Sequence, residues 1–583
     1  MKFTFRTLLF LLCGVMLASA VACTGGNEDV TTGADTTEPA EDVTEQTTEQ
    51  VTTEQVTTEE VTTEEVTTEE PDIMIGDTLD AAYAADFTVS KVFSSDMVVQ
   101  RGERLRVWGW APESENGKKI SGEFMGMFAE ALIENGEWTL QFLAKLPANA
   151  ELGNTMKIYT DTKTVEFENV LVGDVYMVIG QSNVAYTFQN YLYASNTDTK
   201  NYGANMMDEN LPIRLHYNTL NEGEAQGYPK RGTTEVCPDV VHNRTWEKPG
   251  PAAVNRFTAV GYCFAWNLVQ MTEGKVPVGI IEIDGNGQPL GSFLPNEVAD
   301  ALGSDTLQNG IYVPEGVNAT WARYMYNHYM YPFEKYAMAG VVWYQGESDF
   351  LKQWAEDFIE RFNALMTYMR STHNVTNPDF AVYIVEFPSI YDKPAGFNGT
   401  WHYMDLALIR SVVGAIPQTL PNSYVAVSSD LWDDQTYFNS LHPDCKFGQG
   451  LRLAKLAAAV RGDAGTLETA TGPILEKAEF SEDRKTVVLT FTNVGEGLKT
   501  TDGGTEVKGF TFMRNSYTIN NKKGSTIKAE ITAPNQITVT CSASMKNGVV
   551  YNGAADNFFG NQINLCNSYG NPACAFFIAP PEA

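Results

Sequence analysis

The sequence predicts an α/β protein whose central part is a three-layer α/β/α domain with a parallel sheet, flanked by N- and C-terminal small β-domains. The first observation is a series of wholly apolar runs separated by helical patterns, which is typical of parallel strands buried on both faces. The second is a period-two alternation before and after this series, as half-buried antiparallel strands show. The chain has 583 residues, of which 43% are hydrophobic. At roughly 100–200 residues per domain, that length suffices for about three domains.

The N-terminal β-domain is expected over residues 77–168. Residues 105–110 and 138–142 alternate between apolar and polar side chains and predict strands. Asn135-Gly136 between them is a hairpin turn signal, because these two residue types tolerate the positive φ angles of such turns.

The central domain is expected over residues 169–465, where the pattern changes. Strands are predicted at residues 175–179, 278–281, 338–343, 380–385 and 425–427, and helices at residues 257–270, 321–336 and 446–459. In a sheet of this kind the ligand crevice lies beyond the carboxyl ends of the strands. Gly180, Gly287 and Gln345 each follow a strand closely, so we expect them at that edge. The C-terminal β-domain is then expected over residues 466–583, with strands at residues 485–492 and 537–542.

The N-terminus has the pattern of an export signal. Lys2 and Arg6 precede a short apolar stretch, and small residues end the pattern at Ala22, so residues 1–22 are predicted to be a signal peptide. Cys23 follows directly and resembles the lipid-attachment cysteine of a bacterial lipoprotein, which predicts a cell-surface protein; plain secretion is the alternative. Residues 23–76 repeat Val-Thr-Thr-Glu units without aromatic residues, and are expected to form a disordered tether.

Charge and cysteine content exclude some classes of function. The formal net charge is -33, which argues against a nucleic-acid partner. The eight cysteines include no Cys-x-x-Cys pair and no Cys/His cluster at metal-ligand spacing, so no metal site is predicted. Cys566 and Cys574 share one segment and can form a disulfide after export, whereas buried free thiols are the favoured alternative.

Ser182 is the candidate nucleophile. It lies in Gly180-Gln181-Ser182-Asn183, directly after an apolar strand, where a strand, a tight turn and a helix would hold its hydroxyl at the sheet edge. The N-terminus of the helix beyond the turn would favour a developing negative charge. The alternative interpretation is a helix N-cap serine, which is common at strand–helix junctions.

His442 and the segment Gln345-Gly346-Glu347 supply the other groups that acyl transfer needs. A serine nucleophile requires a neutral imidazole as general base, and His442 lies in a loop that leads into a helix. The Gln345 amide is a candidate oxyanion donor, together with backbone N–H groups of Ser182 and of the loop around Gly287. Glu347 is expected either to orient His442 or to tie loops together; the alternative is a buried structural carboxylate that binds backbone amides.

These segments resemble the SGNH-hydrolase esterases, in particular the sialate O-acetylesterase family and its acetylxylan-esterase relatives. The family motifs GQSNM, WYQGES and His-Pro with a following lysine correspond to residues 180–184, 343–348 and 442–446. The similarity extends over about residues 87–578. It implies an SGNH (flavodoxin-like) hydrolase fold. It also implies that Ser182 is the nucleophile and His442 the base, and that the oxyanion and substrate-binding residues are Gln181, Asn183, Gly287, Gln345 and Gly346.

The sequence departs from the family at two places. Asn439 and Ser440 stand where related esterases carry the aspartate of the triad. Glu347, Asp433 or Asp434 would then replace it, or the enzyme works as a Ser-His dyad. Asn286-Gly287 also replaces a pair of glycines at the second oxyanion donor.

The resemblance implies a carbohydrate O-acetylesterase that works through an acetyl-enzyme on Ser182. Its partner would be an acetylated sugar or polysaccharide, with no metal or organic cofactor and no nucleic acid, and with membrane contact only through Cys23. Two alternatives stay open. One is a catalytically degenerate glycan-binding surface protein, suggested by Asn439 and Ser440. The other is an esterase for another small acyl group.

Overall fold

The structure is a computed structural model. It describes residues 84–194, 205–219, 235–241, 244–302, 323–349, 352–372, 377–386, 406–431, 442–512, 526–552 and 563–581. The predicted signal peptide, Cys23 and the tether lie outside these ranges. So do Asp433, Asp434, Asn439 and Ser440.

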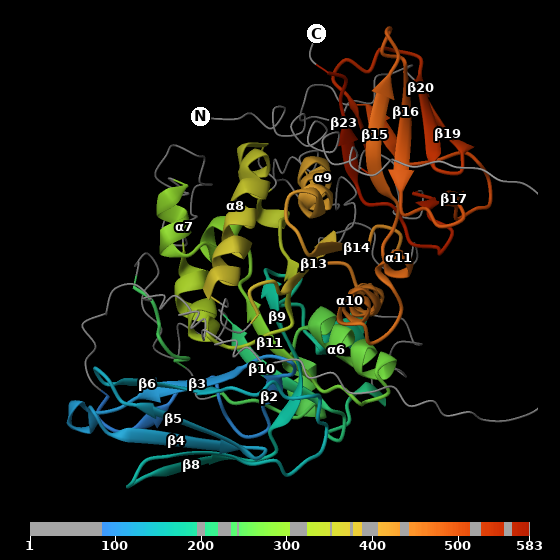
Figure 1. Cartoon of the computed structure of the whole chain (residues 1–583). Helices are drawn as coiled ribbons and strands as arrows, with labels where there is room; N and C mark the ends of the chain where they lie inside the picture. The colour runs from blue at the N-terminus through green and yellow to red at the C-terminus, as the bar shows by residue number, and fades with distance from the viewer. Residues whose placement is uncertain are drawn as a thin grey trace, which may run out of the picture. The chain divides into compact units, whose positions relative to one another are not determined.

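The centre of the fold is a parallel sheet, which confirms the predicted class (Figure 1). Its strands lie side by side in the order β10, β11, β9, β12, β13, β14, and β2 pairs with β9. Their bounds are β2 (Val98–Gln100), β9 (Leu171–Gly180), β10 (Ile213–Thr219), β11 (Val278–Asp284), β12 (Gly340–Tyr344), β13 (Ala381–Glu386) and β14 (Ser423–Val427). Every residue of β9, β11, β12 and β13 is buried, as expected for strands covered on both faces.

Helices cover both faces of this sheet (Figure 1). Helices α6 (Ala259–Met271) and α10 (Lys446–Arg461) pack together on one face, and α8 (Lys352–Thr372) and α9 (Leu406–Ala415) pack together on the other. The shorter helices are α2 (Phe188–Ala194), α5 (Pro251–Arg256), α7 (Asn296–Ala301) and α11 (Leu467–Ala470).

One predicted element differs from the structure, and one strand was not predicted. The helix expected at residues 321–336 begins outside the described residues, and its described part contains a π-helical turn, η5 (Tyr326–Met330), followed by a 3-10 turn, η6 (Tyr331–Phe333). Pro332 has no N–H and cannot continue an α-helix there. Strand β10 was not predicted at all, because its buried run includes Arg214, His216 and Asn218, which a hydrophobicity pattern does not identify as core.

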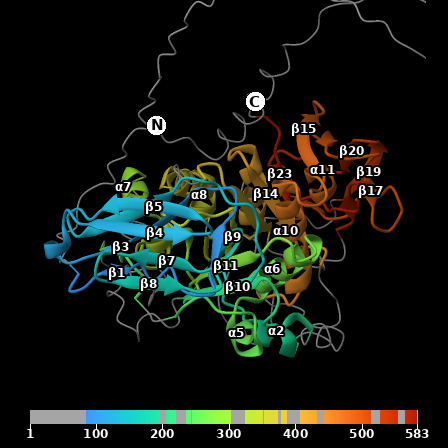
Figure 2. The same ribbon diagram turned by 60° about the horizontal axis from the view of Figure 1, so that its bottom comes forward.

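The N-terminal region forms two antiparallel sheets (Figure 2). In the larger sheet, β4 lies between β5 and β7. One sheet contains β1 (Thr88–Val89), β3 (Leu105–Trp110) and β6 (Glu137–Phe142); the other contains β5 (Met127–Leu132), β4 (Lys119–Phe124), β7 (Met156–Tyr159) and β8 (Thr164–Phe167). Asn135 and Gly136 have φ angles of 51° and 77°, as the predicted hairpin turn requires. The core of this region is continuous with that of the central sheet.

The C-terminal region is also antiparallel and has a hydrophobic core of its own. Its strands form three sheets: β15 (Ile474–Phe480), β16 (Thr486–Thr492), β20 (Gln536–Cys541) and β19 (Ile527–Ala533); β18 (Phe510–Phe512), β21 (Val549–Tyr551) and β23 (Phe576–Ile578); and β17 (Lys499–Thr500) with β22 (Leu565–Cys566). Cys566 and Cys574 are free thiols in the structure, the first buried and the second half-buried. Among the described helices, none has the length and hydropathy of a membrane span.

Candidate active site

The carboxyl ends of the three central strands line up at one edge of the sheet. Gly180 at the end of β9 lies opposite Asp284 of β11 and Tyr344 of β12. The segments that follow these strands contain Ser182, Gly287 and Gln345. The strand register therefore brings the loops of all three predicted segments to the same place, as expected for a ligand crevice in a parallel sheet.

Ser182 lies half-buried in a tight turn after β9. The carbonyl of Gln181 accepts hydrogen bonds from the N–H groups of Val184 and Ala185, each at 2.9 Å. Gly180 is required here, since a Cβ at this position would lie 2.1 Å from the carbonyl oxygen of Tyr344.

The helix expected directly beyond Ser182 begins only at Phe188. Thr187 forms a β-bridge with Thr258, and Phe188 donates its N–H to the carbonyl of Phe257, so the chain stays extended before it can turn into α2. The helix N-terminus is thus not adjacent to Ser182, and its dipole, which acts within about one turn, cannot stabilise charge there.

The loop after β11 lies against the serine turn. Gly285 donates its N–H to the carbonyl of Gly180 at 3.1 Å. Gly287 is exposed and has a φ angle of 69°, and a Cβ at Gly287 would meet no atom within 4 Å. The backbone at Gly287 is therefore open to a ligand at the sheet edge.

Gln345 is fully buried and connects the loops around it. Its Nε2 donates to the Gln288 carbonyl at 3.1 Å and to Asp349 Oδ2 at 2.5 Å, with a longer contact of 3.4 Å to Gln181 Oε1. The Gln181 Oε1 atom also accepts the Ser348 N–H at 3.2 Å. Gln181 and Gln345 thus hold the loops together, and the role of Gln345 as an oxyanion donor stays a prediction.

A buried chain of hydrogen bonds links all three motif segments. Lys446 Nζ donates to Asn183 Oδ1 at 2.6 Å, and Asn183 Nδ2 donates to Glu347 Oε1 at 2.5 Å. Lys446 and Asn183 are fully buried and Glu347 is 4% exposed. We call these three side chains the Lys-Asn-Glu relay. Glu347 thereby takes the second of its two expected roles, tying loops together, and its role toward His442 stays a prediction.

Burial shifts the proton equilibria of the relay toward neutral forms. It raises the pKa of Glu347 to about 7, although the hydrogen bond from Asn183 and the charge of Lys446 oppose that rise. Burial also lowers the pKa of Lys446 to about 8. Asp349, buried beside Gln345, has a pKa raised to about 6 by the same loss of solvation.

His442 lies half-buried, four residues before Lys446 at the start of α10. Burial lowers the pKa of His442, and the nearby positive charge of Lys446 lowers it further. The imidazole is consequently neutral at pH 7, which is the form that accepts a proton from a hydroxyl.

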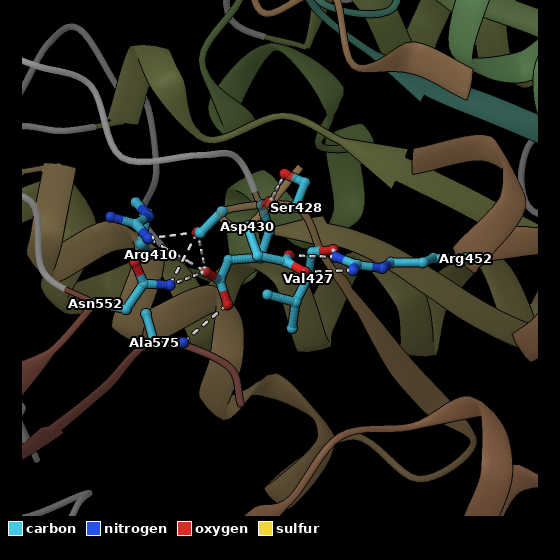
Figure 3. Close-up of polar contacts among 9 residues, drawn as sticks. Arg410, Val427, Ser428, Asp430, Arg452, Asn552 and Ala575 are labelled. Atoms are coloured by element: carbon cyan, nitrogen blue, oxygen red, sulfur yellow. Dashed lines mark hydrogen bonds and ion pairs between the residues drawn. The ribbon is translucent and has the colours of Figure 1, made fainter. Parts of the chain in front are cut away.

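Two clusters of polar contacts lie near the ends of β13 and β14 (Figure 3). Arg452 of α10 binds both carboxylate oxygens of Asp430, at 2.5 and 2.6 Å, and so connects the end of β14 with the helix that follows His442. Glu386 at the end of β13 accepts hydrogen bonds from Ser429 at 3.0 Å and from Arg410 at 3.3 Å.

The C-terminal region completes the second cluster. Asn552 donates its Nδ2 to Glu386 Oε1 at 3.0 Å, and the N–H of Ala575 donates to Glu386 Oε2 at 2.8 Å (Figure 3). Glu386 and Arg410 are both fully buried. The carboxylate therefore has four donors, two of which come from the C-terminal β-sheets.

Sequence reasoning found the segments but missed several of these partners. Lys446 was identified only as part of a motif, and no role was assigned to it. Asp349 and Gln288 were not considered, although Asp349 follows Gln345 by four residues and was open to the same argument as Glu347. Glu386 and Asp430 each follow a predicted strand closely, and this position at a strand end could have indicated that they lie at the sheet edge.

The parallel sheet with helices on both faces is the predicted SGNH-type fold class. Residues 172–457 match the family model described as carbohydrate esterase, sialic acid-specific acetylesterase. The sialate O-acetylesterases of Pongo abelii and Homo sapiens are each 25% identical to this chain over 343 residues. These matches cover 56% of this chain and 61% of each relative, so the chain spans less than two thirds of their length. Both comparisons confirm the family resemblance inferred from the motifs.

A solved structure agrees on the fold. The carbohydrate acetylesterase from Xanthomonas citri superposes with a TM-score of 0.66, covering 85% of this chain and 100% of that chain, at 22% identity. The likeness includes more than the central sheet, because the matched length exceeds the hydrolase domain.

Proposed function

We propose that this protein is a carbohydrate O-acetylesterase that removes acetyl groups from sugar hydroxyls. The observation that carries the proposal is the Lys-Asn-Glu relay. It joins the segment of Ser182, the segment of Gln345 and the segment of His442 at one sheet edge. The family match over residues 172–457 supports the same reaction class.

In the proposed mechanism Ser182 Oγ attacks the acetyl carbonyl carbon while His442 takes the serine proton. The tetrahedral intermediate collapses as His442 returns that proton to the departing sugar oxygen. Water, deprotonated by His442, then attacks the acetyl-enzyme and releases acetate, with the proton returning to Ser182. The mechanism requires Ser182 Oγ and the imidazole to approach within about 2.6–3.2 Å.

The oxyanion would be bound by backbone N–H groups of Ser182 and Gly287, with Gln345 as the third candidate. The open surroundings of Gly287 support this assignment. Loss of one such donor typically costs about 100- to 1000-fold in kcat. A lower kcat in the Gln345→Ala variant, without any change in KM, would support the role of the Gln345 amide as an oxyanion donor.

The test compares the purified protein with Ser182→Ala on 4-nitrophenyl acetate and on an O-acetylated sugar. We expect hydrolysis by the wild-type protein and loss of it in the variant. Equal rates would reject the assignment. An unreactive Ser182 toward a fluorophosphonate probe, with sugar binding intact, would instead favour the glycan-binding alternative.

The acyl specificity is tested by comparing acetyl with butyryl esters of the same alcohol. A small acyl pocket should reject the longer chain. Equal kcat/KM values for both esters would favour the alternative of an esterase for other small acyl groups.

We also propose that the mature protein is exported and held at the cell surface by a lipid on Cys23. The small residues before Cys23 and the polar tether after it support this location. Mass spectrometry of the N-terminal peptide, and release of Cys23→Ala into the medium, test the anchor. A membrane-bound Cys23→Ala variant would contradict it.

A further inference from the structure

Lys446 belongs to the motif segments, and the acyl-transfer mechanism assigns it no task. It is fully buried, as its partner Asn183 is. We propose that Lys446 is a positioning residue whose ammonium group, acting through the Asn183 amide, fixes the Ser182 turn against the loop of Glu347. This inference rests on the proposed esterase function and assigns a further residue to it.

The relay allows only one orientation of the Asn183 amide. Between the pKa of Glu347, about 7, and that of Lys446, about 8, both side chains are mainly charged. An ammonium group only donates hydrogen bonds, and an ionised carboxylate only accepts them. In that state the amide must present its oxygen to Lys446 and its NH₂ group to Glu347. A flipped amide would place two donors face to face at 2.6 Å and two acceptors face to face at 2.5 Å. Two opposite charges thus specify the side chain that follows Ser182 directly.

Lys446 itself is held in place by its surroundings. Its Nζ lies 4.8 Å from the ring centroid of Tyr344 and 5.3 Å from that of Tyr186. Both distances are within the range of cation–π attraction. Tyr344 is fixed in turn, since its hydroxyl accepts a hydrogen bond from Gln449 of α10 at 3.1 Å.

The position of Lys446 in the chain gives the relay its consequence for catalysis. Lys446 is the first residue of α10 and follows His442 by four residues. One side chain therefore connects the segment of the base to the turn of the nucleophile. A displacement of about 1 Å between reacting groups costs on the order of 100-fold in rate.

A polarity swap tests the relay with nearly isosteric changes. In Asn183→Asp the new carboxylate still accepts from Lys446 but faces the Glu347 carboxyl group, whose pKa the like charge raises further, so the hydrogen bond between them is lost only when both groups are ionised. In the double variant Asn183→Asp/Glu347→Gln the Gln amide donates to Asp at position 183, and the relay again carries one positive and one negative charge. At a pH at which both carboxyl groups are ionised, we expect Asn183→Asp to lose about 100-fold in kcat with little change in KM, and the double variant to regain at least about tenfold.

Lys446 itself is tested by Lys446→Met, which should lose about 100-fold in kcat with little change in KM. Its control is Lys455→Met, which removes an exposed lysine from the same helix and should keep the wild-type rate. A double variant as slow as Asn183→Asp, or an Asn183→Asp variant as fast as wild type, would overturn the positioning role. Loss of thermal stability parallel to the loss of kcat, without rescue, would indicate a merely structural contact. A wild-type protein without Ser182-dependent acetyl hydrolysis would reject the esterase function itself, which is a different outcome from failed rescue.

Discussion

The buried carboxyl group of Glu347 predicts a defined change of stability with pH. Its pKa is raised by burial to about 7, from an ordinary value of 4.5. The native state therefore binds this proton more tightly than the unfolded chain does. The stabilisation is complete below pH 4.5 and is lost as the pH rises through 7. In Glu347→Gln this titration is absent, whereas the neutral amide still accepts the hydrogen bond of Asn183.

The size of the effect follows from the pKa difference of 7 − 4.5 = 2.5. At about 1.36 kcal/mol per pKa unit, and counting only the part between pH 5 and pH 8, the change amounts to about 2–3 kcal/mol. At pH 5 the Glu347 side chain is neutral in the native state, as the Gln side chain of the variant is. The free energies of unfolding of variant and wild type should therefore differ little at this pH. At pH 8 the variant should be more stable relative to wild type by that amount.

Lys446 acts in the same direction. Burial lowers the pKa of Lys446, and loss of the anionic partner lowers it further, so the variant gains additional stability as the pH rises. The assay is urea denaturation at pH 5 and pH 8, followed by tryptophan fluorescence. A difference between variant and wild type that is equal at both pH values, or that favours wild type at pH 8, would refute the assigned burial of an ionisable Glu347.

Three further predictions concern other parts of the site. Gly180→Ala should lower the stability by about 1–3 kcal/mol or more, measured by thermal denaturation, because its Cβ would lie 2.1 Å from the Tyr344 carbonyl oxygen. Arg410→Met should cost about 3–5 kcal/mol at pH 8 by leaving Glu386 buried without its charge partner, and Glu386→Gln added to it should recover part of that loss. In the pH profile of kcat/KM, the apparent pKa of the acidic limb should lie below 6.5, since burial and Lys446 lower the pKa of His442. An apparent pKa above 6.5 would contradict that environment.

The strands of the central sheet were predictable because burial on both faces leaves a plain signal. Residues 175–179, 278–281 and 338–343 all fall on β9, β11 and β12, apart from two residues before Gly340. Strand β10 was missed because Arg214 and His216 interrupt its apolar pattern and are nevertheless buried. Arg214 donates to the carbonyls of Leu211 and Ile213, so local hydrogen bonds replace the water that the guanidinium loses. Single-sequence periodicity contains no information about such compensation.

The candidate site was likewise predictable only in part. Ser182, Gln345 and His442 could be proposed because each follows a strand or precedes a helix in a recognisable motif, and their catalytic roles stay predictions. The bonds of Lys446 to Asn183 and of Asn552 to Glu386 join residues 263 and 166 positions apart in the chain. No pattern along the sequence specifies these pairs, because Lys446, Asn183 and Asn552 each look like an ordinary polar residue in their own segment. Their roles follow only from the geometry that the sheet edge imposes.

The carboxyl edge of the sheet carries buried ionisable groups, each of which lowers the stability of the fold when it is charged. The pKa of Glu347, of Asp349 and of Glu386 is raised by burial in each case, and the pKa of Lys446 is lowered by it. A hydrophobic core in these places would make the protein more stable, since buried ion pairs rarely repay their desolvation. Glu347 and Asp349 follow β12, Glu386 ends β13 and Lys446 begins α10, so all four groups lie near the carboxyl edge of the sheet. This is the arrangement expected where stability is given up to fix groups at a functional site.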